Sequence, residues 1–203
     1  MLILSGVAAD GADTPTVLVL GDSLSAGYGI DVDQSWTALL QSRLESQGYE
    51  HRVVNASISG ETTEGGASRI AAALEEFGPE VVVVALGGND GLRGFPPGRI
   101  KSNMLRIIET AEQEGAAVVL LGIRIPANYG TRYTRAFENV YRELAEERKL
   151  PWIEFFMEGV ALDKNLMQAD GIHPNEKAQP RLLDNAWPVI QQALDVEAGV
   201  ITK

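Results

Sequence analysis

The sequence predicts a three-layer α/β fold in which helices cover both faces of a parallel sheet. Short apolar runs rich in valine and leucine alternate with longer segments whose apolar residues recur at helical spacing. The run 81–86 (VVVVAL) is continuously apolar, as expected of a strand that is buried on both faces. Strands that alternate with helices are joined by right-handed crossovers, which produce a parallel sheet.

Five short segments are predicted to form the strands of this sheet. The first (VLVL) is apolar and β-branched, and it ends at Gly21. The later segments have the same short apolar character and are bounded by turn-forming residues. In chain order, the predicted strands are 17–20, 51–58, 81–86, 117–122 and 152–155.

Five predicted helices connect and follow these strands. Several of them end at a glycine, as at Gly78 and Gly115, which is typical of a helix C-terminus. The last predicted helix contains Pro180 and Pro188, and we expect it to be interrupted near both. In chain order, the predicted helices are 36–44, 65–77, 99–114, 133–149 and 176–194.

The chain is predicted to contain one domain, at 16–195, because no internal repeat, linker or low-complexity segment is visible. We interpret 1–15 as a leader or signal remnant and 196–203 as a loose C-terminal tail. The start, MLILSGV, is apolar and is followed by small and polar residues, as in a secretory signal whose basic beginning has been removed. This interpretation predicts a periplasmic or secreted bacterial protein with a truncated leader; the alternative is a loose leader without a targeting function.

The composition excludes several classes of protein. With 28 acidic and 17 basic residues, the formal charge is −11, which argues against binding to nucleic acid or to anionic lipid. No apolar stretch approaches the roughly 18 residues needed to span a bilayer, so we expect no stable membrane insertion. The chain has no cysteine and only two widely separated histidines, and we therefore expect no metal and no cofactor. We also expect a monomer.

Three polar, turn-forming segments follow the first three predicted strands. They are 21–25 (GDSLS), 57–62 (SISGET) and 87–90 (GGND). Ligands of an open parallel sheet bind beyond the carboxyl ends of its strands. One such segment would be weak evidence, because glycine, serine and asparagine are common in turns. Three of them at the same edge of the sheet predict a binding site.

A fourth segment, 170–174 (DGIHP), places a carboxylate three residues before an imidazole. A carboxylate that holds one ring nitrogen protonated leaves the other nitrogen free to accept a proton from a hydroxyl. The pattern predicts His173 as a general base that Asp170 orients, with a serine hydroxyl as the nucleophile. The order serine, acid, histidine is one of several known for this chemistry.

The local sequence pattern alone is also consistent with structural roles for these residues. Ser23 is equally suited to be a helix N-cap, Asp170 to cap the last helix and Asn89 to stabilise its own loop. We expect Asp22 and Asp90 to be structural hydrogen-bonding residues.

In these four segments the sequence resembles the SGNH, or GDSL, hydrolase family. The family blocks occur in order as GDSLS, SGET, GGND and DGIHP, and the resemblance extends over about 16–194. It is greatest for the subgroup of bacterial periplasmic esterases that includes thioesterase I, protease I, lysophospholipase and arylesterase. The strings VVNASISGETT, LGGNDGLRG, PANYG and MQADGIHP carry that closer resemblance.

The resemblance implies the SGNH hydrolase fold, with a five-stranded parallel sheet in flavodoxin-like order. It also implies an oxyanion hole formed by the backbone N–H groups of Ser23 and Gly60 and by the side-chain amide of Asn89. The implied activity is hydrolysis of carboxylic esters and thioesters through an acyl-enzyme on Ser23, with a small acyl ester or thioester as substrate.

Two alternatives stay open. A carbohydrate acetylesterase shares the same blocks, but its sugar site would display exposed aromatic side chains, and Trp36 and Trp187 are predicted to be helix core. A non-catalytic flavodoxin-like binding module would not need the pairing of Asp170 with His173.

His51 precedes the second strand, where we expect it to be exposed and uninvolved in catalysis. The loop at 124–132 is predicted to contact the substrate pocket.

Overall fold

The structure, a computed structural model, describes residues 14–197 and contains one five-stranded sheet. Neighbouring strands are parallel, in the order β2-β1-β3-β4-β5. The α/β fold and the flavodoxin-like order are thereby confirmed. The strands are β1 (Thr16–Gly21), β2 (Arg52–Asn55), β3 (Val81–Ala85), β4 (Ala117–Leu121) and β5 (Trp152–Ile153).

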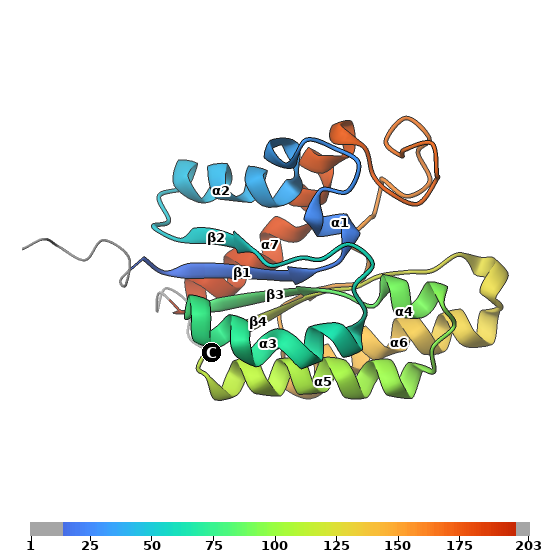
Figure 1. The fold of residues 1–203 in the computed structure, drawn as a ribbon, viewed down its shortest axis with the longest axis horizontal. Coiled ribbons are helices and arrows are strands. Elements are labelled where there is room, and N and C mark those ends of the chain that lie inside the picture. The colour runs from blue at the N-terminus through green and yellow to red at the C-terminus, as the bar shows by residue number, and fades with distance from the viewer. Residues whose placement is uncertain (1–13, 198–203) are drawn as a thin grey trace, which may run out of the picture.

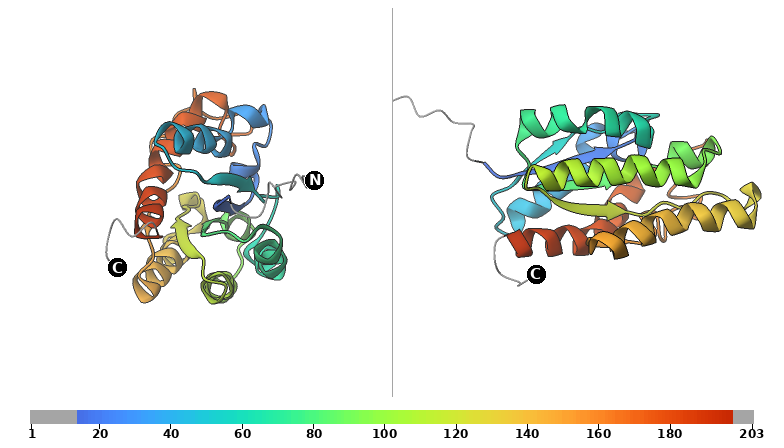
Figure 2. Two further views of the ribbon diagram at one scale, coloured as in Figure 1. Left: turned by 90° about the vertical axis from the view of Figure 1, so that its left-hand side faces the viewer. Right: turned by 90° about the horizontal axis from the view of Figure 1, so that it is seen from below.

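Helices cover both faces of the sheet (Figure 1). The helices α2 and α7 pack beside each other on one face, and α3, α5 and α6 lie on the other, as the end-on view in Figure 2 also shows. The chain steps outward from β1 to β2 and then back across the sheet, and right-handed crossovers in opposite directions place helices on opposite faces. The five helices are α2 (Trp36–Ser46), α3 (Thr63–Phe77), α5 (Pro97–Gln113), α6 (Thr131–Arg148) and α7 (Gln179–Glu197).

The core lies on both sides of the central strands. Every residue of β1 and of β3 is buried, whereas β2 and β5, at the two edges of the sheet, are only partly covered. The chain leaves β1 and β3 in opposite directions, so the switch point of the sheet lies between these two strands. The segments that carry Ser23 and Asn89 follow β1 and β3 and therefore meet there.

Two one-turn helices were not predicted. They are α1 (Ser23–Ala26) and α4 (Gly88–Leu92), and each begins within two or three residues of the end of a strand. One helical turn is too short to produce a 3.6-residue periodicity in the sequence. The second strand is also shorter than the predicted 51–58, because the Asn55 side chain accepts a hydrogen bond from the Ser57 N–H and turns the chain.

The predicted interruption of the last helix is wrong. A separate 3-10 turn, Glu176–Ala178, precedes α7, and α7 continues without a break to Glu197 with Pro188 inside it. Pro180 lies in the first turn of α7, where a missing backbone N–H breaks no helical hydrogen bond. Residues 1–13 of the predicted leader and 198–203 of the predicted tail lie outside the described residues.

The prediction that His51 is exposed is also wrong. Its side chain is only 12% exposed, and its Nε2 lies 3.0 Å from a carboxylate oxygen of Glu80. Both residues lie immediately before strands, at the amino edge of the sheet and hence opposite Ser23. Within residues 14–197, no helix is long and apolar enough to cross a membrane.

Candidate active site

Ser23 begins the one-turn helix α1 directly after β1. Asp22, and not Ser23, is the N-cap: its side chain accepts a hydrogen bond from the Leu24 N–H at 3.0 Å. Gly27 ends the helix in a left-handed conformation, with a φ of 74°. Ser23 is therefore held at the carboxyl edge of the sheet, and its hydroxyl is not used for capping.

The three residues predicted to form a triad are joined by hydrogen bonds. The Nε2 atom of His173 lies 2.9 Å from Ser23 Oγ, and its Nδ1 atom lies 2.6 Å from Asp170 Oδ2. Ser23 and His173 are 150 residues apart in sequence. The alternative role of Asp170 as a helix cap is wrong, because Asn175 caps the 3-10 turn that precedes α7.

The Asp170 carboxylate is shared between the backbone and the imidazole. Its Oδ1 accepts the backbone N–H groups of Ile172 and His173, at 2.9 and 3.0 Å, so Oδ2 is left to face the ring. These hydrogen bonds, the one from the His173 ring first, lower the pKa of Asp170 to about 2. The carboxylate is therefore ionised at neutral pH and favours a proton on His173 Nδ1.

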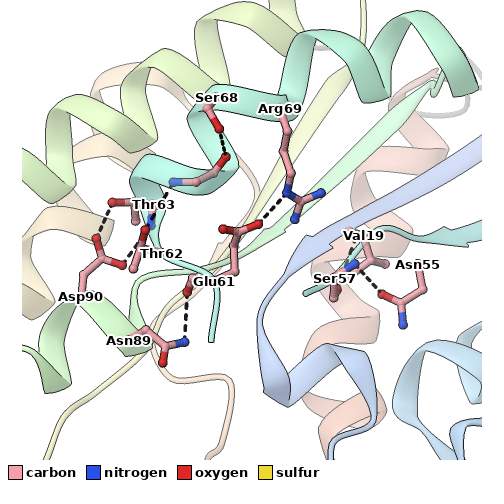
Figure 3. A network of polar contacts seen from close by, with 11 residues as sticks. Val19, Asn55, Ser57, Glu61, Thr62, Thr63, Ser68, Arg69, Asn89 and Asp90 are labelled. Atoms are coloured by element: carbon pink, nitrogen blue, oxygen red, sulfur yellow. Dashed lines mark hydrogen bonds and ion pairs between the residues drawn. The ribbon is translucent and has the colours of Figure 1, made fainter. Parts of the chain in front are cut away.

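Asn89 and Gly60 lie near each other, where α4 faces the turn after β2. The Asn89 Nδ2 atom donates to the backbone oxygen of Glu61 at 3.0 Å (Figure 3). Arg93 donates to the Gly60 oxygen at 3.2 Å. Gly60 has a φ of 81°, a conformation that favours glycine, and no atom lies within 4 Å of the position of its missing Cβ. Two side-chain donors therefore hold this turn: Asn89 in α4 and Arg93 at the C-terminal end of α4.

Asp90 has the structural role predicted for it. It is 1% exposed, and its carboxylate accepts the backbone N–H and the hydroxyl of Thr63, at 2.9 and 2.6 Å (Figure 3). These bonds attach α4 to the first turn of α3. Asn89, the neighbour of Asp90, is thereby fixed at the edge of the sheet.

Asp22 is a buried carboxylate next to Ser23 in the chain. It is 2% exposed, and burial raises its pKa to about 6. Its second oxygen lies 3.4 Å from Asn89 Nδ2. Asp22 therefore links the turn that carries Ser23 to Asn89, which is a more specific task than the predicted structural hydrogen bonding.

Tyr28 is a residue at this site that the sequence reasoning missed. Its ring lies over the His173 imidazole, with the ring centroids 4.5 Å apart and the planes tilted by 40°. The only local signal is its place between Gly27 and Gly29, both in left-handed conformation, soon after Ser23. Because glycines are common in turns, contact of Tyr28 with His173 did not follow from this signal.

Other predicted features lie around this centre. The loop after β4 contacts α4 through the Tyr129 hydroxyl, which donates to the Leu92 oxygen at 2.8 Å. Contact of this loop with a substrate stays a prediction. Within residues 14–197, no group of three or more His, Asp or Glu side chains is arranged to hold a metal ion.

Comparisons with known proteins agree with this geometry. The chain is 50% identical to the protein named Esterase TesA of Pseudomonas aeruginosa, over 95% of this chain and 98% of that protein. It is 46% identical to the protein named Thioesterase 1/protease 1/lysophospholipase L1 of Escherichia coli, over 90% of this chain and 86% of that protein.

A solved structure of the psychrotrophic esterase EstA from Pseudoalteromonas sp., inhibited by monoethylphosphonate, superimposes with a TM-score of 0.84 at 39% identity. The match covers 89% of this chain and 98% of that one. Residues 19–180 match the GDSL-like lipase/acylhydrolase family. The chain therefore belongs to this family of ester hydrolases, as its four sequence blocks predicted.

Proposed function

We propose that this enzyme hydrolyses carboxylic esters and thioesters through an acyl-enzyme on Ser23. The observation that carries the proposal is the continuous hydrogen-bonded path from Asp170 through His173 to the Ser23 hydroxyl. A serine hydroxyl is a weak nucleophile unless a neighbouring base accepts its proton, and this path supplies that base.

In the first half of the reaction, Ser23 Oγ attacks the acyl carbon while its proton passes to His173 Nε2. The imidazolium that forms is stabilised by the ionised Asp170. Collapse of the tetrahedral intermediate breaks the bond from the acyl carbon to the leaving oxygen or sulfur. The proton on Nε2 is then transferred to the leaving group, and an acyl ester of Ser23 remains.

The negative charge on the tetrahedral oxygen requires donors that are already in place. We assign the backbone N–H groups of Ser23 and Gly60 and the side-chain amide of Asn89. One Asn89 N–H bonds the Glu61 oxygen at 3.0 Å, and the other has only the longer, 3.4 Å contact to Asp22. We assign the second N–H, which makes the weaker contact, to the oxyanion.

In the second half, water replaces the leaving group. His173 accepts a proton from the water as it attacks the acyl carbon, and then returns the proton to Ser23 Oγ as the acyl ester breaks. The products are the free carboxylic acid and the regenerated enzyme. No cofactor takes part in any step of this proposal.

The distribution of exposed apolar side chains supports an acyl substrate. All six exposed large apolar residues of the described chain lie in connections that follow strands, and so at the carboxyl edge of the parallel sheet. They are Tyr28, Val32, Ile58, Tyr129, Leu162 and Ile172. A groove of about 550 Å³ also lies along the segment before His173, where Leu162 and Met167 line it. Such surfaces suit an acyl chain.

The two indoles predicted as helix core give a sugar substrate no support, although the Tyr28 and Tyr129 rings are exposed at the carboxyl edge. Trp36 is fully buried, as predicted for helix core, and Trp187 is packed against the core beneath Arg43. Neither indole is available as a stacking surface for a sugar. We further propose that the enzyme acts in the periplasm or outside the cell, because the apolar start of the sequence is typical of an exported protein. We also propose that it is a monomer.

A panel of substrates tests the proposal. We expect hydrolysis of nitrophenyl esters of short and medium acyl chains, of acyl thioesters and of lysophospholipids, with little activity on acetylated sugars. Covalent labelling of Ser23 by a phosphonate ester, read by peptide mass spectrometry, tests the acyl-enzyme. Hydrolysis confined to acetylated sugars, or labelling of any other residue, would contradict the proposal.

A further inference from the structure

The Ser23 and His173 segments come from opposite ends of the chain, and no strand pairing joins them. The residues around His173 form a small hairpin, which we define as 166–175. The Gln168 N–H donates to the His173 oxygen at 2.8 Å, and a single antiparallel bridge pairs Met167 with Pro174. Asp170 and Ile172, at the tip of the hairpin, are exposed.

The base of this hairpin is attached to the rest of the protein. Asn175 donates from its side chain to the oxygens of Asn165 and Met167, at 2.9 and 3.3 Å. Gln179 is buried and bridges the Asn175 oxygen to the backbone N–H of Trp36 in α2. These contacts hold the foot of the hairpin and do not reach its tip.

One side chain joins the hairpin to the segment after Ser23. The Gln168 amide nitrogen donates to the Tyr28 oxygen at 2.7 Å and to the Pro174 oxygen at 3.0 Å. Apart from the pair formed by His173 and Ser23, this is the one hydrogen bond between 22–30 and the hairpin among the interactions of residues 14–197.

The local backbone is shaped to receive this side chain. A Cβ atom on Gly29 would lie 2.3 Å from Gln168 Oε1, so only glycine allows the amide to approach the chain so closely. The residue that accepts the hydrogen bond, Tyr28, is also the one whose ring lies over the His173 imidazole. The contact with Gln168 therefore holds the backbone from which that ring extends.

We propose that Gln168 is a positioning residue, which fixes the His173 imidazole over Ser23 by joining the hairpin to Tyr28. The inference rests on the proposed function. Without this amide, the tip of the hairpin would be held to the Ser23 segment only by the Tyr28 ring on the His173 imidazole and by the hydrogen bond that must break and re-form during reaction. Misplacement of a reacting group by about 1 Å can lower a rate by about 100-fold.

The first test compares Gln168→Leu and Gln168→Glu with the parent. Leucine has a similar size and no donor, and a glutamate carboxylate cannot donate to the two carbonyl oxygens. We expect kcat on a nitrophenyl ester to fall about 10- to 100-fold, with KM within about twofold. Gln191→Leu is the matched control, because Gln191 is partly buried in α7 and contacts Tyr49, away from the hairpin.

The second test uses a double-mutant cycle on an activated acetate ester. If Gln168 acts through His173, then Gln168→Leu lowers the rate in the parent and has no further effect in His173→Ala. An equal loss in both backgrounds would show a role that is independent of His173. Gln168 also lines the groove beside the hairpin, so a raised KM with an unchanged kcat would identify it as a substrate contact and overturn the proposal.

A spectroscopic test does not depend on turnover. The chain has two histidines, so the proton between His173 Nδ1 and Asp170 can be assigned by comparison with His173→Ala. We expect its resonance to shift or broaden in Gln168→Leu and to be unchanged in Gln191→Leu. An unchanged resonance together with full activity overturns this inference alone, whereas full activity of Ser23→Ala overturns the proposed function itself.

Discussion

The Asn89 side-chain nitrogen lies 3.4 Å from the Asp22 carboxylate, so the residue before the proposed nucleophile touches a proposed oxyanion donor. The other Asp22 oxygen caps α1 by accepting the Leu24 N–H. One buried side chain therefore contacts both the Asn89 amide and the first turn of the helix that carries Ser23. This arrangement couples the turn that carries Ser23 to the amide of Asn89.

Asp22→Asn tests this coupling. The variant retains an acceptor for the Leu24 N–H, but it turns an amide N–H toward the Asn89 amide where the carboxylate had accepted. We expect kcat to fall about 10- to 100-fold, which is less than complete removal of an oxyanion donor typically costs. Steady-state kinetics on a nitrophenyl ester measure it, with Asp184→Asn in α7 as a control that should keep full activity.

The same variant predicts a change in stability with pH. Burial raises the pKa of Asp22 to about 6 from an ordinary value of 3.8, so the folded protein holds this proton more tightly than the unfolded chain. The contribution of Asp22 to the free energy of unfolding therefore falls as pH rises from about 4 to about 6. Denaturant titrations across this window should show a smaller fall in Asp22→Asn. An identical pH dependence in both proteins would contradict the assignment.

Ser23→Ala is expected to abolish hydrolysis. The hydroxyl is the proposed nucleophile, and loss of such a group lowers turnover by on the order of 10⁴-fold or more. The fold should persist, because Asp22 and not Ser23 caps α1. Circular dichroism and ester hydrolysis check both statements, with Ser42→Ala in α2 as the matched control. A well-folded Ser23→Ala enzyme with near-native turnover would refute the nucleophile.

Substitutions of the remaining site residues should lower kcat by different amounts. In Asp170→Asn, the side-chain oxygen can still accept the Ile172 and His173 N–H groups, so the amide nitrogen faces His173 Nδ1. This favours the wrong tautomer, and we expect a loss in kcat between about 10² and 10⁴. His173→Ala should be at least as damaging.

Asn89→Ala should retain more activity than either of those variants, because two further oxyanion donors remain. Loss of one donor typically costs about 10²- to 10³-fold. Kinetics on the three purified variants decide the order. A nearly active His173→Ala beside an inactive Asn89→Ala would reverse the roles proposed for them.

Chelators should leave the activity unchanged. The proposed steps use only side chains and backbone N–H groups of this chain, and His51, the second histidine, is bound to Glu80 at the opposite edge of the sheet. Esterase activity measured with and without EDTA is the test. A loss in EDTA that zinc or calcium restores would reveal a metal requirement.

Most of the fold was predictable because its signals are local. The continuous apolar runs of β1 and β3 follow from burial on both faces, and the glycines after α3 and α5 mark where those helices end. The prediction of the last helix failed at Pro188, where packing of α7 against the sheet and α2 keeps a proline inside a continuous helix. Propensity is overridden in this way when tertiary contacts stabilise the helix.

By itself, the amino-acid sequence determined the order of strands and helices and which residues are candidates for the reaction, because periodicity and motif spacing belong to neighbouring residues. Only the tertiary structure decided that Asp22 reaches Asn89 and that Gln168 joins Tyr28. These contacts span 67 and 140 residues of sequence. They form because the parallel sheet brings the carboxyl ends of its strands to one edge, and no local pattern specifies which side chains meet there.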